Sequence, residues 1–185
     1  MEHFLLAPDF ETSRLRIAYH DDVNWKDWTA FFIPENLAYL GLEPDLGPEE
    51  LSKSWSLRQR GRYEEGHGAV LFLDKVSGDV VGNAGLIKKC INGIDLIEVG
   101  YSLLSSKQGN GYATEMAQAI RDEAFLKTDV DELCSTIHPH NLSSQRVAER
   151  NGMRIFKRTQ DKGMDLDIWK ITRKEWERIR PNSQK

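Results

Sequence analysis

The amino-acid sequence predicts a mixed α/β domain in which one sheet and its helices share a single core. Strand-like segments with period-2 alternation occur along the whole chain, separated by segments with helical spacing. A glycine-rich turn at 108–111 joins an apolar, strand-like segment to an alanine-rich, helical one. The chain has 185 residues, 39% of them hydrophobic and 29% charged, which suits a folded domain. We therefore expect one domain over residues 1–185, with its core at about 10–180.

The first part of the chain is predicted to be one strand followed by two helices. Residues 11–19 alternate apolar and polar side chains, as a half-buried strand does. Residues 21–32 place aromatic side chains at helical spacing behind an acidic cap, and Pro34 interrupts them. After a proline-containing loop at 41–48, a second helix occupies residues 48–62. It opens with a proline and two acids, which suit the first turn of a helix.

The middle of the chain is predicted to contain three strands. Residues 69–73 are continuously apolar, and residues 75–79 supply a turn to a hairpin partner at 80–87. The Asn-Gly dipeptide at 92–93 is a good tight turn, and it precedes a third strand at 94–104.

The last third of the chain alternates helices and strands. The predicted elements are a helix at 116–126, a strand at 132–137, a short helix at 143–151 with Gly152 as its cap, a hairpin of 153–157 and 164–171, and a helix at 174–180. The predicted order over the whole chain is β-α-α-β-β-β-α-β-α-β-β-α, and no internal repeat is visible.

Composition argues against several classes of protein. The formal net charge of −4 disfavours a nucleic-acid-binding face and weakly favours a cationic substrate. Residues 1–10 lack a secretion signal, and no apolar run approaches the ~18 residues of a membrane span. We expect a soluble, cytoplasmic protein with neither nucleic acid nor membrane as a partner. Cys90 and Cys134 lie in apolar surroundings and are predicted to be buried, reduced thiols.

The glycine-rich segment has the composition of an anion-binding loop. Glycines let the backbone approach a phosphate, and the free N–H groups at the start of a helix point at it. The segment lacks the Gly-Lys-Ser/Thr ending of a Walker A loop, and Thr114 stands where a dinucleotide fingerprint has Gly or Ala. The pattern that remains is Gln108-x-x-Gly111-x-Ala113.

This pattern resembles the pyrophosphate loop of the GCN5-related N-acetyltransferases, the GNAT family, which bind acetyl-CoA. Three further segments resemble the branch of that family that includes the ribosomal-protein N-terminal acetyltransferases. They are Thr12-Ser13-Arg14-Leu15, Ile97-Glu98-Val99-Gly100-Tyr101, and the stretch from Asn141 to Met153 with its Asn-x-x-Ser start. The resemblance covers about residues 12–153. Two positions depart from it, because Gly109 stands where the branch often has an aromatic residue and Met153 replaces the usual Phe.

The resemblance implies a central, mostly antiparallel sheet flanked by helices. It implies transfer of an acetyl group from acetyl-CoA, as co-substrate and without a metal, to a primary amine that attacks directly in a ternary complex. A bulge in the strand before the loop would present N–H groups, near Leu103 or Leu104, to the thioester carbonyl. The predicted cofactor-binding residues are Leu103, Leu104, Gln108, Gly109, Asn110, Gly111, Tyr112, Ala113, Thr114 and Asn141.

Two residues are predicted to be catalytic. A protonated amine cannot attack, so a base or a water chain must remove its proton. Glu98 is the candidate because it is the lone acid inside an apolar strand, and a solvent-facing glutamate is the alternative. Ser144 lies where the ribosomal branch carries a serine suited to protonate the CoA thiolate. The alternative is that Asn141 and Ser144 only cap a helix.

The sequence does not identify the amine that accepts the acetyl group. It could be a protein N-terminus or a small amine, such as an aminoglycoside or a polyamine. A non-catalytic acyl-CoA sensor is the alternative from another class. His138 and His140 suggest a metal site only faintly, because no third ligand lies near them in the sequence. The sequence does not decide between a monomer and a homodimer.

Overall fold

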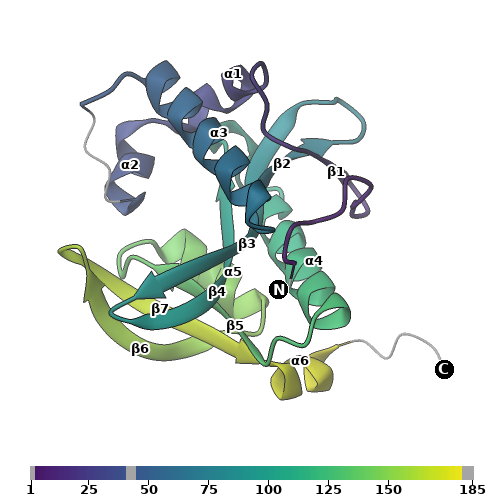
Figure 1. Ribbon diagram of the computed structural model, residues 1–185, viewed down its shortest axis with the longest axis vertical. Helices are drawn as coiled ribbons and strands as arrows, with labels where there is room; N and C mark the ends of the chain where they lie inside the picture. The colour runs from purple at the N-terminus through teal and green to yellow at the C-terminus, as the bar shows by residue number, and fades with distance from the viewer. Residues whose placement is uncertain (1–2, 41–44, 181–185) are drawn as a thin grey trace.

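The computed structural model describes residues 3–40 and 45–180, and its central feature is a seven-stranded sheet (Figure 1). The strands lie in the order β1-β2-β3-β4-β5-β7-β6. Neighbouring strands are antiparallel except β4 and β5, which are parallel. The strands are β1 (Leu15–Ala18), β2 (Gly68–Asp74), β3 (Val80–Ile91), β4 (Ile94–Leu103), β5 (Glu132–Ile137), β6 (Arg154–Asp161) and β7 (Met164–Thr172). The predicted mostly antiparallel sheet is confirmed.

Helices cover both faces of this sheet (Figure 1). They are α1 (Trp25–Trp28), α2 (Pro34–Leu40), α3 (Pro48–Glu64), α4 (Tyr112–Lys127), α5 (Leu142–Arg150) and α6 (Arg173–Ile179), with 3-10 turns η1 (Thr29–Phe31) and η2 (Ser105–Lys107). Within the described residues, no helix combines the length and the apolar character that crossing a membrane requires.

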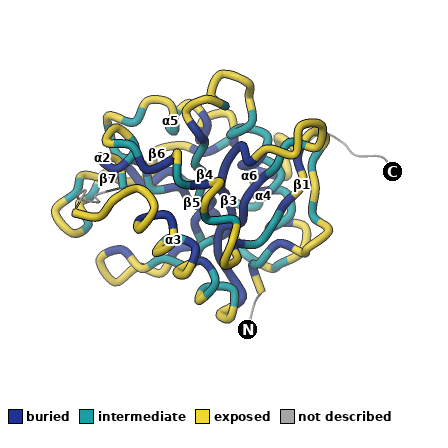
Figure 2. Tube along the Cα trace, turned by 90° about the horizontal axis from the view of Figure 1, so that it is seen from above, coloured by how far each residue is buried: buried dark blue, intermediate teal, exposed yellow. Residues whose placement is uncertain are grey.

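Buried side chains form three clusters among the described residues, and alternation along β2 contributes to two of them. On β2, Phe72 faces the large cluster under α4, which includes Met116 and Ile120. Its neighbour Leu71 faces the opposite side and packs with Trp28 of α1. Successive side chains of a strand point to opposite faces, so one apolar strand serves both layers. Figure 2 shows the buried residues gathered along the central strands, with the exposed ones at the outer turns.

The first helical region differs from its prediction. The segment after β1 forms only the short helix α1 and the 3-10 turn η1. Pro34 then begins α2, a helix that the sequence analysis missed. Proline suits the first turn of a helix because its φ is already helical and its missing N–H has no acceptor there. Of the predicted loop at 41–48, residues 41–44 lie outside the described residues.

Other boundaries also shift. Helix α4 begins at Tyr112, four residues before the predicted start, because Gly111 caps it. Strand β3 continues beyond the predicted residue 87 to Ile91, so that Cys90 lies near a hairpin end and is exposed. The prediction of a buried Cys90 is therefore wrong, while Cys134 is buried as expected. Gly152 follows α5 with a φ of 81°, which confirms its predicted capping position.

A buried histidine at the end of β1 makes the stability of the fold depend on pH. His20 is 3% exposed, and its Nε2 contacts the side-chain amide of Asn83 on β3. Its Nδ1 has no hydrogen-bond partner among the described residues. Burial lowers the pKa of His20 from 6.5 to about 4, although Asp21 acts in the opposite direction. The folded state therefore holds this imidazole neutral.

We expect the free energy of unfolding to fall as the pH drops from 6.5 towards 4. In that window the unfolded chain binds a proton at His20 and the folded chain does not, so stability rises with pH. The loss attributable to His20 should approach about 3 kcal/mol at pH 4. Urea unfolding at several pH values would measure it. A His20→Asn variant should lose this part of the slope, and equal slopes in both proteins would contradict the assignment.

Candidate active site

The sheet opens between its two parallel strands. Strands β4 and β5 pair at one point, Glu98 with Cys134, and the carbonyl of Val99 accepts a hydrogen bond from Ser135 Oγ at 2.8 Å. No ladder pair joins the two strands beyond this point within the described residues, so their carboxyl ends separate. The unpaired stretch, here called the wedge, comprises residues 99–103 of β4 and 135–137 of β5, next to the loops that follow these strands.

Backbone N–H groups of β4 face the wedge. The N–H of Leu104 donates to Val81 of β3 at 3.1 Å. Hydrogen-bonding directions alternate along an antiparallel strand, so the N–H groups of Leu103 and Tyr101 face the β5 side. The register between β3 and β4 is unbroken over Ile94–Leu103, so this ladder does not contain the expected bulge. Among residues 3–40 and 45–180, the strand register pairs neither Tyr101 nor Leu103 with a residue of β5.

The loop that follows β4 has the geometry of an anion site. Gly109 and Gly111 have φ of 80° and 78°, a left-handed region that favours glycine. Gly111 caps α4, and its carbonyl accepts from Glu115 N–H at 3.1 Å. The N–H groups of Tyr112, Ala113 and Thr114 therefore belong to the first turn, where no intrahelical acceptor exists. Together with the positive end of the helix dipole, they favour a bound anion.

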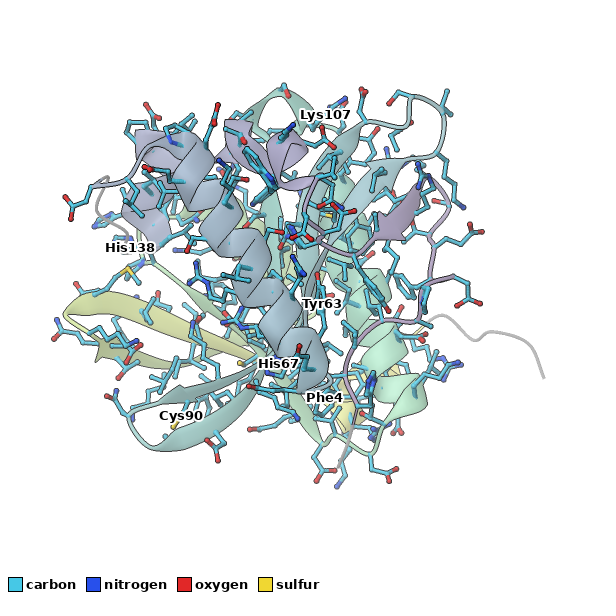
Figure 3. The ribbon with its side chains drawn as sticks, turned by 45° about the horizontal axis from the view of Figure 1, so that its top comes forward. Phe4, Tyr63, His67, Cys90, Lys107 and His138 are labelled. Carbon is cyan, nitrogen blue, oxygen red and sulfur yellow. The ribbon has the colours of Figure 1, made fainter. Side chains whose placement is uncertain are left out.

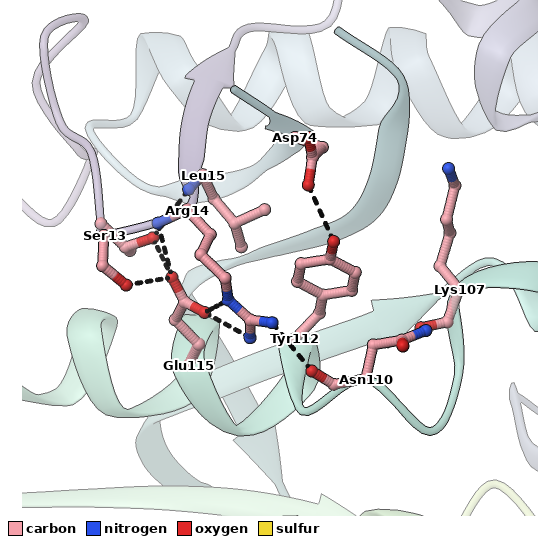
Figure 4. A network of polar contacts seen from close by, with 9 residues as sticks. Ser13, Arg14, Leu15, Asp74, Lys107, Asn110, Tyr112 and Glu115 are labelled. Atoms are coloured by element: carbon pink, nitrogen blue, oxygen red, sulfur yellow. Dashed lines mark hydrogen bonds and ion pairs between the residues drawn. The ribbon is translucent and has the colours of Figure 1, made fainter. Parts of the chain in front are cut away.

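The segment before β1 buttresses this loop (Figure 4). Glu115 accepts from Thr12 Oγ1 at 2.5 Å and from Arg14 Nε at 2.6 Å. The Arg14 guanidinium also donates to the Asn110 carbonyl at 3.0 Å and lies 4.4 Å from the centre of the Tyr112 ring. Burial raises the pKa of Glu115, but the hydrogen bonds from Thr12 and Arg14 outweigh it, so the pKa lies below its usual value. The carboxylate thus stays charged and anchors Arg14.

The motif of residues 12–15 has a structural role that its sequence did not predict. In the structure, Arg14 ties the first strand to the loop about a hundred positions later. Two further contacts fix the same region. Tyr112 donates to Asp74 at 2.8 Å (Figure 4), and Lys107 pairs with Asp79 at 2.8 Å. The conformation of the loop is therefore held by side chains from β1 and from the hairpin of β2 and β3.

Glu98 is buried, but it is not an isolated acid. Its Oε1 accepts from the N–H and the Oγ1 of Thr136, at 3.1 and 2.6 Å. Its Oε2 lies 3.2 Å from Nζ of Lys89. These partners come from β5 and β3, so no local pattern around Glu98 could reveal them. The carboxylate lies on the same face as Leu96, as predicted, which is the face that α3 covers.

Ser144 and Asn141 lie at the start of α5. Asn141 Oδ1 accepts from the Ser144 N–H at 3.1 Å, which is the capping contact that the sequence analysis kept as an alternative. The Ser144 carbonyl accepts from the Tyr101 hydroxyl at 2.8 Å, and burial raises the pKa of Tyr101. The Tyr101 hydroxyl thus joins β4 to α5, a contact that the sequence did not predict. Helix α5 packs on the α4 face, so Glu98 and Ser144 flank the wedge from opposite faces of the sheet.

His138 (labelled in Figure 3) lies beside Tyr39 of α2, and His140 lies next to His138. The His138 ring is 5.7 Å from that of Tyr39 and 5.5 Å from that of His140. His138 Nδ1 accepts from the His140 N–H at 3.2 Å, so the pair is tied within its own turn. Over residues 3–40 and 45–180, no three His, Cys, Asp or Glu side chains gather in a way that could hold a metal ion. The rings of Tyr39, His138 and His140 instead pack against one another.

Comparison with known proteins agrees with this geometry. The family model described as an acetyltransferase (GNAT) domain matches residues 14–154. Fold and site define an acetyl-CoA-dependent acyltransferase. The chain belongs to the GNAT family, whose members transfer acetyl groups from acetyl-CoA to amines.

Individual relatives add detail without fixing the acceptor. The chain is 27% identical to the N-acetyltransferase YnaD of Bacillus subtilis over 173 residues, 89% of this chain and 97% of that one. It is 36% identical to YkkB of the same organism over 98 residues, which cover 52% of this chain and 57% of YkkB. The fold resembles RimL, a ribosomal L7/L12 acetyltransferase solved with coenzyme A, at a TM-score of 0.64 and 18% identity, covering 87% of this chain and 95% of RimL.

Proposed function

We propose that this protein acetylates a primary amine by direct attack on acetyl-CoA within a ternary complex. The observation that carries the proposal is the wedge between β4 and β5, which opens beside the free N–H groups of the loop at 108–113. An extended thioester can pass through such a gap while its diphosphate rests on the loop. The acceptor then reaches the thioester from the α3 face, on which Glu98 lies.

The cofactor would be held mainly by backbone groups. The N–H groups of Gly109, Asn110, Gly111, Tyr112, Ala113 and Thr114 would face the diphosphate, and the exposed Gln108 side chain could reach it. Because the Leu104 N–H is already bonded to Val81, the Leu103 N–H is the better donor to the thioester carbonyl. Asn141 uses its Oδ1 as a cap, so its amide NH₂ is left to donate to the pantetheine arm.

The chemical step moves one acetyl group. The amine nitrogen bonds to the carbonyl carbon, the carbon–sulfur bond breaks, and sulfur leaves with the electron pair. Free amines have pKa values of ~8 to ~10.4, so an ammonium acceptor must lose one proton before it attacks and a second as the amide forms. We assign the first proton to Glu98 through a water, since Thr136 and Lys89 already contact its carboxylate, and Glu98 then releases it to solvent. The second proton passes to water, and Ser144, or a water beside it, would protonate the thiolate and regain its own proton from that water.

Thiol release from acetyl-CoA, measured against a panel of peptides, polyamines and aminoglycosides, tests this function. Release that depends on one class of amine, with mass spectrometry placing the acetyl group on its nitrogen, is the expected result. Calorimetry with coenzyme A alone measures separately whether the cofactor binds. Binding of coenzyme A without release from any amine would instead support a non-catalytic acyl-CoA sensor.

A further inference from the structure

Two arginines of α3 lie on one face of the helix near Glu98. Arg58 and Arg62 are four positions apart and continue the stripe begun by Leu51 and Trp55, which pack on the aromatic cluster of α1, η1 and α2. Burial lowers the pKa of both arginines. The charge of Arg58 lowers the pKa of Arg62 further, whereas the charge of Glu98 raises it. Arg58 is exposed, whereas Arg62 is half-buried and lies within electrostatic reach of Glu98.

Neither arginine has an ion-pair partner among the described residues. The Arg58 guanidinium lies 5.0 Å from the centre of the Trp55 ring, and Arg62 makes only a long contact of 3.5 Å to the side-chain oxygen of Gln59. Arg60, between them in sequence, is by contrast paired with Asp22.

The nearby acids are already engaged. Glu98 is neutralised by Lys89, and Glu65 contacts His67 at 3.1 Å. Like charges four positions apart on a helix destabilise it, so this pair has no evident structural benefit. Binding sites commonly contain such locally unfavourable arrangements of charge, which the rest of the fold offsets.

We propose that the acetyl acceptor is an amine that also carries an anionic group, a carboxylate or a phosphate, which Arg58 and Arg62 bind. The inference rests on the proposed acetyl transfer and names the class of its acceptor. Guanidinium groups bind carboxylates and phosphates through paired hydrogen bonds, and more strongly where water is partly excluded. The three cations Arg58, Arg62 and Lys89 outnumber the two nearby acids, Glu98 and Glu65, so this face disfavours a polyamine or an aminoglycoside. The local field thus opposes the cationic substrate that the net charge weakly favoured.

Matched pairs of acceptors test the inference. L-glutamate is compared with L-glutamine and O-phospho-L-serine with L-serine, with spermidine as the cation. A peptide beginning Ser-Asp is compared with one beginning Ser-Asn. We expect at least about a tenfold higher kcat/KM for the anionic member of one pair, which also tells carboxylate from phosphate. The Arg58→Gln/Arg62→Gln variant should raise KM for that acceptor about tenfold or more, and leave the KM of acetyl-CoA unchanged.

Arg60→Gln is the control, because it removes a charge from the same helix at a position already paired with Asp22. It should keep the preference for the anionic acceptor. Binding is measured separately, by calorimetry of the acceptors on the protein saturated with coenzyme A, so the test does not depend on turnover. A neutral or cationic amine used equally well would overturn the inference while the acetyl transfer stands. Failure of the anionic acceptors both to bind and to react would overturn it too, whereas failure to bind coenzyme A would refute the proposed function itself.

Discussion

Replacing Gly111 by glutamate is expected to abolish the binding of acetyl-CoA. The residue caps α4 at a φ of 78°, beside the first-turn N–H groups. A carboxylate here would stand where the diphosphate must lie, and like charges at such a site repel strongly. Titration calorimetry with coenzyme A should show the dissociation constant rising by at least about 100-fold.

Two other variants separate charge from backbone strain. Gly163 has a φ of 81° in the turn between β6 and β7, and a side chain there would meet nothing within 4 Å. Gly163→Glu therefore carries the same backbone strain and charge away from the loop, and it should bind coenzyme A normally. Gly111→Ala, which adds strain without charge, should weaken binding less than Gly111→Glu. Normal binding by Gly111→Glu would refute the loop as the cofactor site.

The second large effect is expected at Glu98. Glu98→Gln should lower kcat by about 100- to 10,000-fold, because an amide cannot take up the proton of the amine. The affinity for coenzyme A should stay the same, since the loop at 108–113 does not contact this residue. Steady-state kinetics at saturating acetyl-CoA would measure kcat, and calorimetry would measure the affinity for coenzyme A.

The contacts of Glu98 require matched controls. Lys89→Gln keeps the carboxylate but removes its 3.2 Å ion-pair partner, and Thr136→Val removes the hydroxyl that donates to it at 2.6 Å. If the carboxylate itself does the chemistry, both variants should keep far more activity than Glu98→Gln. Equal losses in all three would mean that the group only joins β4 to β5. Unchanged turnover in Glu98→Gln would remove the residue from the mechanism.

Some parts of the site were predictable because they are local. A strand, a glycine-rich turn and a helix start are contiguous in sequence, so spacing alone predicted a loop centred on Gly111. The role of Arg14 was not predictable, because it depends on contacts with Glu115 and Asn110 far along the chain. The expected bulge near Leu103 is absent from the ladder between β3 and β4. Which N–H groups are free depends on where β5 leaves β4, and β5 is a separate segment.

The sequence by itself determined the mixed α/β class, the order of most elements and the family, because periodicity, turn residues and contiguous motifs are properties of short segments. Only the tertiary structure decided that Lys89 and Thr136 hold Glu98 and that Ser144 lies across the wedge from it. It also decided that Arg58 and Arg62 have no ion-pair partner within residues 3–40 and 45–180. Each of these depends on through-space contacts between strands and helices that are distant in the chain. The chemistry of the acceptor side is therefore encoded in packing rather than in any motif.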